Sequence, residues 1–287
     1  MGVVVTGASG FLGGYTVAAL AMRGQSVNAV ARRDPRRWRQ KAPATVRTTV
    51  VSDYGMAPVS KSDVIVHLAE DATGGGSETD RMETVRLLLE KGARRFIYGS
   101  SAIVYGDGAK RPRSPLDKIA PRGAYAAAKC ACEELVLATP GSVVVRLTNL
   151  YGPGMSERNV LSDILAGLAT PGAIRIRDLA PVRDYLWVGD AAEGIADIAM
   201  GSSVGIFNLG TGKGTTVRDL AKAVAVASGQ QKRVIEGSEI AHDSHLVVDY
   251  SAATAAFGWR PRVSLDEGID LMIAGKNVPT PVNEAKK

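Results

Sequence analysis

The sequence has few of the residues that build metal centres or disulfide-stabilised folds. Its 287 residues include only two cysteines and three histidines. Cys130 and Cys132 are one residue apart, too close for a disulfide framework, and no second pair completes a zinc site. The histidines are scattered, without acidic or cysteine partners at ligand spacing. We therefore expect neither a structural disulfide nor a bound metal.

Long apolar runs are also missing. No stretch reaches the ~18 residues that a membrane-spanning helix needs. The first apolar stretch, Val3–Val5, runs directly into Thr6 and Gly7 and is too short for the core of a secretory signal. We therefore expect a cytoplasmic protein with no membrane partner.

Aromatic residues are scarce, at 5% of the chain, while the net charge is +6. Much of the positive charge lies in one short segment, formed by Arg32, Arg33, Arg36, Arg37, Arg39 and Lys41. Trp38 is the only aromatic residue in this segment, so stacking platforms for single-stranded nucleic acid are poorly supported. We expect no nucleic-acid partner, and the segment is either a solvated loop or a site for an anionic small molecule.

Short apolar runs alternate with helical patterns through the first half of the chain. We predict strands at Val3–Val5, Val27–Val30, Val46–Val51, Val64–Leu68, Phe96–Tyr98 and Val143–Leu147, with helices at Leu12–Met22, Thr79–Glu90 and Tyr125–Ala138. This alternation predicts an α/β fold with a doubly wound parallel sheet.

Three glycines follow the first strand and open the first helix. Gly7 permits a tight turn, Gly10 allows close backbone approach to a pyrophosphate, and Gly13 allows close helix packing. The free N–H groups at the helix start then bind the phosphates. The spacing is Gly-x-x-Gly-x-x-Gly, and the predicted cofactor contacts of this loop are Gly7, Ser9, Gly10, Phe11, Leu12 and Gly13.

The end of the second strand bears on the choice of nicotinamide cofactor. Ala31 occupies the place where an acid normally binds the ribose of NAD, and Arg32 and Arg33 follow it. Arginine suits a 2′-phosphate, so we expect NADP. NAD remains possible because Asp34 could still reach the ribose.

After Asn149 the pattern changes, and the turn cluster Tyr151–Gly154 precedes shorter, more mixed elements. We expect a helix near Val160–Leu168, a strand at Ile174–Ile176 and a helix at Ala191–Met200. We predict a dinucleotide-binding domain at 1–150 and a smaller, mainly substrate-binding region at 151–287. Residues 183–212 are expected to return to the sheet domain.

Tyr125 and Lys129 stand four residues apart on a predicted helix, so they share one face. A nearby ammonium stabilises a phenolate, and such a pair can exchange a proton with a sugar hydroxyl while a hydride moves to a nicotinamide. Ser101 closes the fifth predicted strand, at the edge where such sheets bind ligands, and can hydrogen-bond the reacting oxygen.

Together these stretches resemble the extended short-chain dehydrogenase/reductase family over nearly the whole chain. The matching stretches are Thr6–Gly13, Val64–Ala69, Ser100–Gly106, Tyr125–Lys129, Arg146–Pro153, Arg183–Asp190, Phe207–Gly212 and Phe257–Pro261. The resemblance implies a Rossmann-type sheet, a nucleotide-sugar substrate and a homodimer built on the Thr79–Glu90 and Tyr125–Ala138 helices.

The resemblance also assigns roles to individual residues. It makes Ser101, Tyr125 and Lys129 the catalytic residues, with Tyr125 and Lys129 also touching the cofactor. Further cofactor contacts are expected at Asp53 and Tyr54 beside the adenine and at Leu68 and Ala69 along the groove. Ser101, Asn149 and Arg183 are the expected substrate contacts.

The chain departs from the family pattern at three places. Ala102 and Ile103 stand where 4,6-dehydratases carry an Asp-Glu pair, so elimination of water is not expected. Ile240–Asp243 lacks the arginine that often binds the substrate diphosphate, and the usual asparagine near Asp80 or Arg81 is missing. The substrate is then an unusual nucleotide sugar or another molecule.

Three functions stay open. The first is C4 epimerisation of a nucleotide sugar, and the second is an NADPH-dependent 4-ketoreductase of a deoxysugar nucleotide. The third, from another class, is a non-catalytic NAD(P)-sensing protein, against which the joint presence of Ser101, Tyr125 and Lys129 argues.

Overall fold

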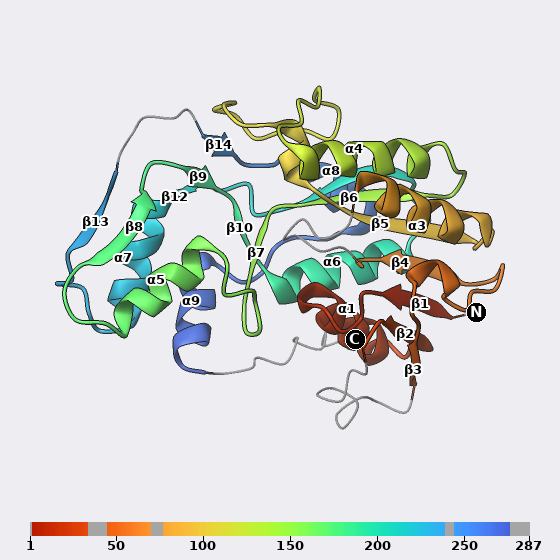
Figure 1. The fold of residues 1–287 in the computed structure, drawn as a ribbon, viewed down its shortest axis with the longest axis horizontal. Helices are drawn as coiled ribbons and strands as arrows, with labels where there is room; N and C mark the ends of the chain where they lie inside the picture. The colour runs from red at the N-terminus through yellow and green to blue at the C-terminus, as the bar shows by residue number, and fades with distance from the viewer. Residues whose placement is uncertain (1, 34–44, 70–76, 239–243, 276–287) are drawn as a thin grey trace.

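Seven parallel strands form the centre of the computed structural model, which describes residues 2–33, 45–69, 77–238 and 244–275 (Figure 1). Their order across the sheet is β11-β6-β5-β4-β1-β2-β3. The strands are β1 (Val3–Thr6), β2 (Val27–Ala31), β3 (Val46–Val50), β4 (Val64–His67), β5 (Arg95–Ser101), β6 (Val143–Leu147) and β11 (Gly205–Leu209). The predicted α/β class with a doubly wound parallel sheet is confirmed.

Helices cover both faces of this sheet. On one face lie α1 (Phe11–Met22), α6 (Val188–Met200) and α8 (Ser251–Phe257), and on the other α3 (Glu78–Glu90) and α4 (Ala124–Leu137). In β1, Val3 and Val5 pack with α1 and α6, whereas Val4 packs with α3 and α4. Because both faces are buried, the strands read as continuous apolar runs.

The strand order reverses between β1 and β4. From β1 the chain proceeds to β2 and β3 on one side, and from β4 it proceeds to β5 and β6 on the other. Ligands of such sheets bind at the carboxyl ends of the strands beside this reversal.

A second core lies at one end of the sheet, on the left in Figure 1. It is built from α5 (Val160–Leu168), α7 (Val217–Ala227), α9 (Leu265–Ile273), β8 (Ile174–Asp178) and β13 (Ile235–Ser238). Short strands link it to the main sheet: β7 (Asn149–Tyr151), β9 (Val182–Arg183), β10 (Tyr185–Trp187), β12 (Thr215–Thr216) and β14 (His245–Leu246). The 3-10 helices η1 (Tyr54–Met56) and η2 (Ala102–Tyr105) follow β3 and β5.

The predicted elements are found within a few residues of their expected bounds. The largest differences are β5, which extends to Arg95–Ser101, and α6, which begins at Val188. Within 183–212, β11 joins the main sheet and α6 packs on α1. The helix α8 packs there too, although it lies outside that range. The division at residue 150 stays a prediction.

Cys130 and Cys132 are both free thiols buried within α4. Over the described residues, no helix combines the length and apolar character needed to cross a bilayer. The same residues contain no group of three or more His, Cys, Asp or Glu side chains that could hold a metal ion.

Candidate functional site

The glycine loop after β1 is packed so tightly that side chains have no room. Gly7 has a φ of +73°, and a Cβ there would lie 2.7 Å from the Cα of Ala69. A Cβ on Gly13 would lie 2.1 Å from the carbonyl oxygen of Gly7. The Gly10 N–H donates to that same oxygen at 2.8 Å and closes the turn. The helix α1 then begins at Phe11 with no acidic residue in its first turn, which leaves its N-terminus suited to an anion.

A cavity of about 320 Å³ opens at this loop. Its walls come from the segments that follow β1, β2 and β4, together with η1. The lining residues are Gly7, Ser9, Gly10, Arg32, Arg33, Tyr54, Leu68 and Ala69, all of them predicted cofactor contacts. Phe11, Leu12 and Gly13 lie behind them at the start of α1, and the Asp53 carboxylate caps η1 by accepting from the Gly55 N–H at 2.6 Å.

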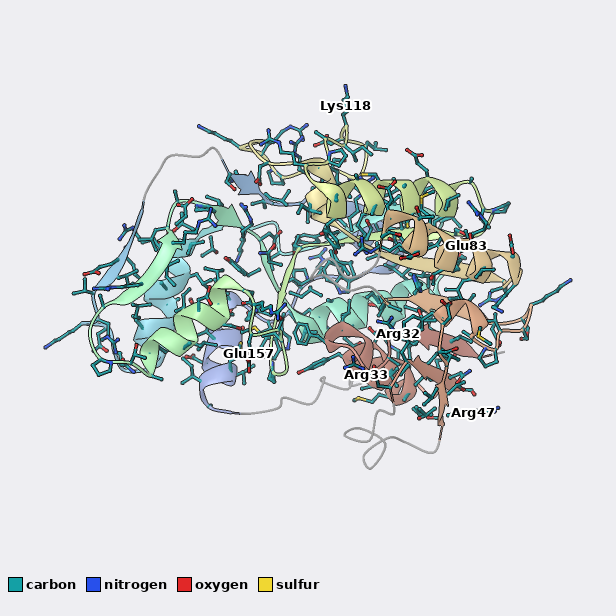
Figure 2. All side chains as sticks on the ribbon, viewed as in Figure 1. Arg32, Arg33, Arg47, Glu83, Lys118 and Glu157 are labelled. Carbon is teal, nitrogen blue, oxygen red and sulfur yellow. The ribbon has the colours of Figure 1, made fainter. Side chains whose placement is uncertain are left out.

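The two arginines at the end of β2 are exposed and carry the positive charge of this cavity (Figure 2). The Arg32 guanidinium carbon lies 5.5 Å from the ring centroid of Tyr54. Ala31, just before it, is fully buried and offers no carboxylate. Asp34, the acid that would favour NAD, lies outside the described residues, as does the rest of the basic segment.

Tyr125 and Lys129 meet on α4, as the sequence predicts. The Lys129 ammonium is 5.8 Å from the ring centroid of Tyr125 and 4.8 Å from that of Tyr98. Lys129 is buried and donates to the backbone carbonyl of Gly99 at 2.6 Å, whereas Tyr125 is half-buried. The carbonyl of β5 therefore fixes the ammonium beside the phenol.

Ser101 is the last residue of β5, two positions after Gly99. Its hydroxyl accepts from the Ile103 N–H at 3.3 Å and caps η2. The serine and the Tyr125–Lys129 pair thus lie on neighbouring elements, with β5 contributing both Ser101 and the carbonyl that holds Lys129.

Arg81 is a neighbour of Tyr125 that the sequence does not reveal. Its guanidinium carbon lies 5.8 Å from the Tyr125 ring centroid, reaching across from the first turn of α3. The resemblance marks this region only by a missing asparagine. The contact joins residues more than forty positions apart, so no local pattern indicates it.

Asn149 and Arg183, the predicted substrate contacts, share a second cavity of about 280 Å³. Its other lining residues are Val160, Asp163, Ile176, Arg177, Asp178, Pro181, Tyr185 and Val217. Arg183 donates to the hydroxyl of Ser244 at 2.7 Å and lies 3.6 Å from the Asp107 carboxylate. The segment Ile240–Asp243, where the family often has a diphosphate-binding arginine, lies outside the described residues.

A larger hollow of about 500 Å³ lies between α5 and β8. Small residues and Arg175 line it, and no acid–base pair faces it. The predicted cofactor and substrate contacts line the two smaller cavities, and Ser101, Tyr125 and Lys129 line none of the three, so volume does not identify the active site here.

A buried carboxylate, Asp184, braces the wall of the second cavity. It accepts from the Thr211 N–H at 2.8 Å, the Thr211 hydroxyl at 2.7 Å and the Gly212 N–H at 3.0 Å. Burial raises the pKa of Asp184, and the Thr211 and Gly212 hydrogen bonds oppose that shift. The carboxylate therefore ties Arg183 and Tyr185 to the loop that follows β11.

Comparison with known proteins adds an independent finding. The model of the NAD dependent epimerase/dehydratase family matches residues 3–210. UDP-glucuronic acid decarboxylase 2 of Arabidopsis thaliana is 27% identical over 302 residues, covering 94% of this chain and 67% of that protein. The dTDP-L-rhamnose 4-epimerase of Burkholderia thailandensis is 28% identical over 341 residues, covering 93% of this chain and 92% of that protein.

Among solved structures, dTDP-glucose 4,6-dehydratase from Bacillus anthracis in complex with NAD superposes with a TM-score of 0.83. The two chains are 18% identical, and 96% of each is covered. At this identity the likeness shows a shared fold over nearly the whole chain.

Proposed function

The chain belongs to the NAD dependent epimerase/dehydratase family and is an enzyme of the extended short-chain dehydrogenase/reductase type, and we propose that it epimerises a nucleotide sugar at C4. The observation that carries the proposal is the Tyr125–Lys129 pair, held to β5 through Gly99 at the same sheet edge as the glycine-lined cavity. An acid–base pair and a dinucleotide cradle are the two parts that such a reaction needs.

The residues of the first cavity fit a nicotinamide dinucleotide. The close contacts around Gly7 and Gly13 bring backbone N–H groups to the surface where a pyrophosphate would lie. Tyr54 and Arg32 stand where the adenosine end would bind. A nicotinamide held by these residues would supply reversible hydride transfer at the sugar carbon.

The proton chemistry belongs to the protein. We assign Tyr125 the removal of the proton from the sugar hydroxyl and its return in the second half of the reaction. To accept that proton Tyr125 acts as the phenolate and becomes the phenol. The Lys129 ammonium, kept in place by its bond to Gly99, favours the phenolate form electrostatically. Ser101 hydrogen-bonds the same sugar oxygen from the end of β5.

The neighbours of Ser101 support epimerisation over dehydration. Ala102 is buried and Ile103 is partly exposed, and neither carries an acid or base. Loss of water from a neighbouring sugar carbon requires such a group next to the catalytic hydroxyl. Without it, the ketone that forms at the oxidised carbon keeps its substituents and is reduced again.

The second cavity supports a nucleotide sugar as substrate. Asn149 supplies an amide and Arg183 a guanidinium, the donors that phosphate oxygens prefer. The relatives from Arabidopsis thaliana and Burkholderia thailandensis are named for UDP and dTDP sugars.

The proposal is tested with Tyr125→Phe, which removes only the hydroxyl. We expect the fold and cofactor binding to persist and kcat to fall by roughly 10²–10⁴-fold. The assay follows C4 epimerisation across UDP- and dTDP-hexoses. Full activity of the variant on the true substrate contradicts the assignment of the base.

A second candidate, an NADPH-dependent 4-ketoreductase of a deoxysugar nucleotide, is favoured by Arg32 and Arg33. Both line the cofactor cavity, and Ala31 leaves no carboxylate to repel a 2′-phosphate. We therefore propose tighter binding of NADP(H) than of NAD(H). A hydrogen bond to a charged group contributes roughly 1.5–3 kcal/mol, about ten- to a hundredfold in affinity, and less when exposed.

Titration of the cofactor-free protein at one ionic strength separates these possibilities. Weaker NADP(H) binding by Arg32→Ala or Arg33→Ala supports the preference. Equal or tighter NAD(H) binding, unchanged in both variants, means that the arginines are a solvated surface and removes the main support for the reductase. A cofactor retained through purification favours the epimerase.

We also propose a cytoplasmic homodimer in which α3 and α4 of each subunit pack together. Leu87 on α3 and Leu137 on α4 are 38% and 42% exposed and are available for that contact. Light scattering at micromolar concentration that shows only a ~30 kDa species contradicts the dimer. Cell fractionation tests the location.

A further inference from the structure

A buried carboxylate, Glu133, lies one helical turn beyond the catalytic lysine. Tyr125, Lys129 and Glu133 are spaced four residues apart on α4, so they lie along one face of the helix. Glu133 is 2% exposed, and its charge must be compensated by partners inside the protein.

Two side chains compensate the buried charge of the Glu133 carboxylate. The Ser100 hydroxyl donates to it at 2.5 Å from β5, and Arg146 pairs with it at 2.6 Å from β6. Arg146 is itself 4% exposed, and its guanidinium carbon lies 4.7 Å from the ring centroid of Tyr105. The Tyr105 hydroxyl in turn donates to Asn208 on β11 at 2.7 Å. One carboxylate thus connects the catalytic helix to the centre of the sheet.

Consecutive residues of β5 contact consecutive turns of α4. Gly99 accepts from Lys129, Ser100 donates to Glu133, and the next residue is Ser101. Two consecutive residues of β5 are therefore attached to two consecutive turns of α4. Together they fix how far the helix lies along the strand that carries the catalytic serine.

We propose that Glu133 and Ser100 are positioning residues that set the register of Tyr125 and Lys129 relative to Ser101. The inference rests on the proposed function, because it gives these residues a part in the same acid–base chemistry. A misplacement of about 1 Å at a reacting group costs roughly 10²-fold in rate. A single hydrogen bond that prevents such a shift therefore affects turnover more than stability.

The experiment compares two buried serines. Ser100→Ala removes the hydroxyl that holds Glu133 and leaves the Glu133–Arg146 ion pair intact. Ser142→Ala is the matched control, since Ser142 is 4% exposed just before β6 and its hydroxyl has no hydrogen-bond partner within the described residues. Each variant removes only one hydroxyl group and leaves the backbone unchanged, so both are expected to fold.

For Ser100→Ala we expect kcat to fall by about tenfold or more, while KM and the cofactor Kd stay within about threefold. The Tm is expected to change by no more than about 4 °C. Ser142→Ala is expected to match the wild type in all four quantities. Equal kcat values for the two variants overturn the proposal.

A second measurement does not depend on activity. Hydrogen exchange followed by mass spectrometry is expected to show faster exchange in the first turns of α4 in Ser100→Ala, and no change in Ser142→Ala. Unchanged exchange in Ser100→Ala overturns the positioning role. If the wild type turns over no nucleotide sugar but the exchange difference is present, the proposed function fails and the positioning contact stands.

Glu133→Gln tests the other end of the contact. The amide keeps the size of the side chain and an acceptor for Ser100 but leaves Arg146 without its counter-charge. We expect a kcat loss of roughly 10²-fold in folded protein, larger than that of Ser100→Ala. A folded Glu133→Gln with wild-type kcat overturns the proposal, and if this variant does not fold, the serine pair decides it.

Discussion

The two cavities of this protein are constructed in opposite ways. The cofactor cavity opens at a tightly packed glycine loop, and its lining residues directly follow β1, β2 and β4 or lie in η1. Its shape depends on side chains that are absent, above all at Gly7 and Gly13. The lining of the substrate cavity comes from several short elements and includes four charged residues, Asp163, Arg177, Asp178 and Arg183.

The difference separates local from non-local construction. The glycine turn at the cofactor cavity is encoded by a few consecutive residues, because a glycine spacing determines the turn wherever a strand precedes it. A side-chain cavity exists only after distant segments have been joined. Asp184 is an example, since it accepts hydrogen bonds from Thr211 and Gly212, which are more than twenty-five residues away from it in the sequence.

The largest expected effect comes from distorting the glycine loop at the cofactor cavity. In Gly13→Ala the new Cβ would lie 2.1 Å from the Gly7 carbonyl oxygen, and backbone cannot yield as a flexible side chain does. We expect a stability loss of about 3 kcal/mol and a loss of cofactor binding of 10²-fold or more, as an estimate from overpacking. Thermal melts and cofactor titration measure the two effects.

Gly14→Ala is the matched control for this prediction. The nearest atom to its added Cβ is the Ala8 carbonyl oxygen at 3.7 Å, an ordinary contact. Alanine within a helix is favoured over glycine by about 1 kcal/mol, so this variant is expected to bind cofactor normally and to melt no lower. If both variants lose the cofactor equally, the cavity does not depend on the packing at Gly13.

The substrate cavity is expected to depend on the hydrogen bonds of Asp184. Asp184→Asn places an amide N–H₂ among the donors of Thr211 and Gly212, so at least one contact is lost. We expect about 2 kcal/mol of destabilisation and a raised KM for the nucleotide sugar. The cofactor Kd is expected to stay unchanged, because no cofactor-cavity residue contacts Asp184 among the described hydrogen bonds. A parallel rise in the cofactor Kd would show that the two cavities are energetically coupled and would contradict this prediction.

Tyr185 sharpens the comparison with an effect of the opposite sign. Burial raises its pKa to about 12, with Arg183 opposing, so the phenol is neutral at working pH. Its hydroxyl is buried and has no hydrogen-bond partner among the described residues. Tyr185→Phe is therefore expected to be neutral or more stable by up to about 1 kcal/mol, with KM unchanged. A raised KM would show that this hydroxyl serves the substrate.

The smallest effect is expected at Asp63, on the opposite edge of the sheet from both cavities. Burial alone would raise its pKa, but hydrogen bonds from the Ser60 and Gly2 N–H groups prevail and lower it. Because the pKa of this carboxyl is lower in the folded protein than in the unfolded chain, it stabilises the fold at any pH above its unfolded-state pKa. That stabilisation is lost as the pH falls through the folded-state pKa. Asp63→Asn is expected to cost about 0.5 kcal/mol at pH 7, with solvent exposure allowed for.

The pH dependence of that difference provides the check. The gap between the melting temperatures of wild type and Asp63→Asn is expected to be full well above the ordinary aspartate pKa of ~3.9 and to shrink as the pH falls below it. Both cavities are expected to keep their ligand affinities. A gap that persists in acid means that the amide disturbs the turn for a reason other than charge.

Much of the sheet half could be predicted because its information is local. A strand such as β1 is buried on both faces, so Val3–Val5 is apolar throughout and is recognisable without its neighbours. Tyr125 and Lys129 are likewise paired by helix geometry alone. The cavity brings together Gly7, whose role the glycine spacing predicts, with Tyr54 and Ala69, whose roles the family resemblance implies, and the structure supplies their proximity.

The second half of the chain could be predicted less well, because its short elements depend on partners that are distant in the sequence. The strands β9, β12 and β14 have two residues each, too few for a periodic pattern, and each exists because a distant partner pairs with it. The pattern analysis above predicts no helix at α7, α8 or α9, although Ser264 and Glu267 form a capping box at the start of α9. The contact of Arg81 with Tyr125 is likewise absent from any local pattern, since it joins two helices, α3 and α4, that are far apart in the sequence.

The sequence by itself determined the parallel sheet, the glycine turn and the Tyr125–Lys129 pair, because each depends on spacings of a few residues. Only the tertiary structure decided that Ser100 would meet Glu133, that Asn149 would share a cavity with Arg183, and that Asp184 would brace it. Those contacts join segments whose distance in space is set by the packing of whole elements, and a linear pattern carries no measure of that distance.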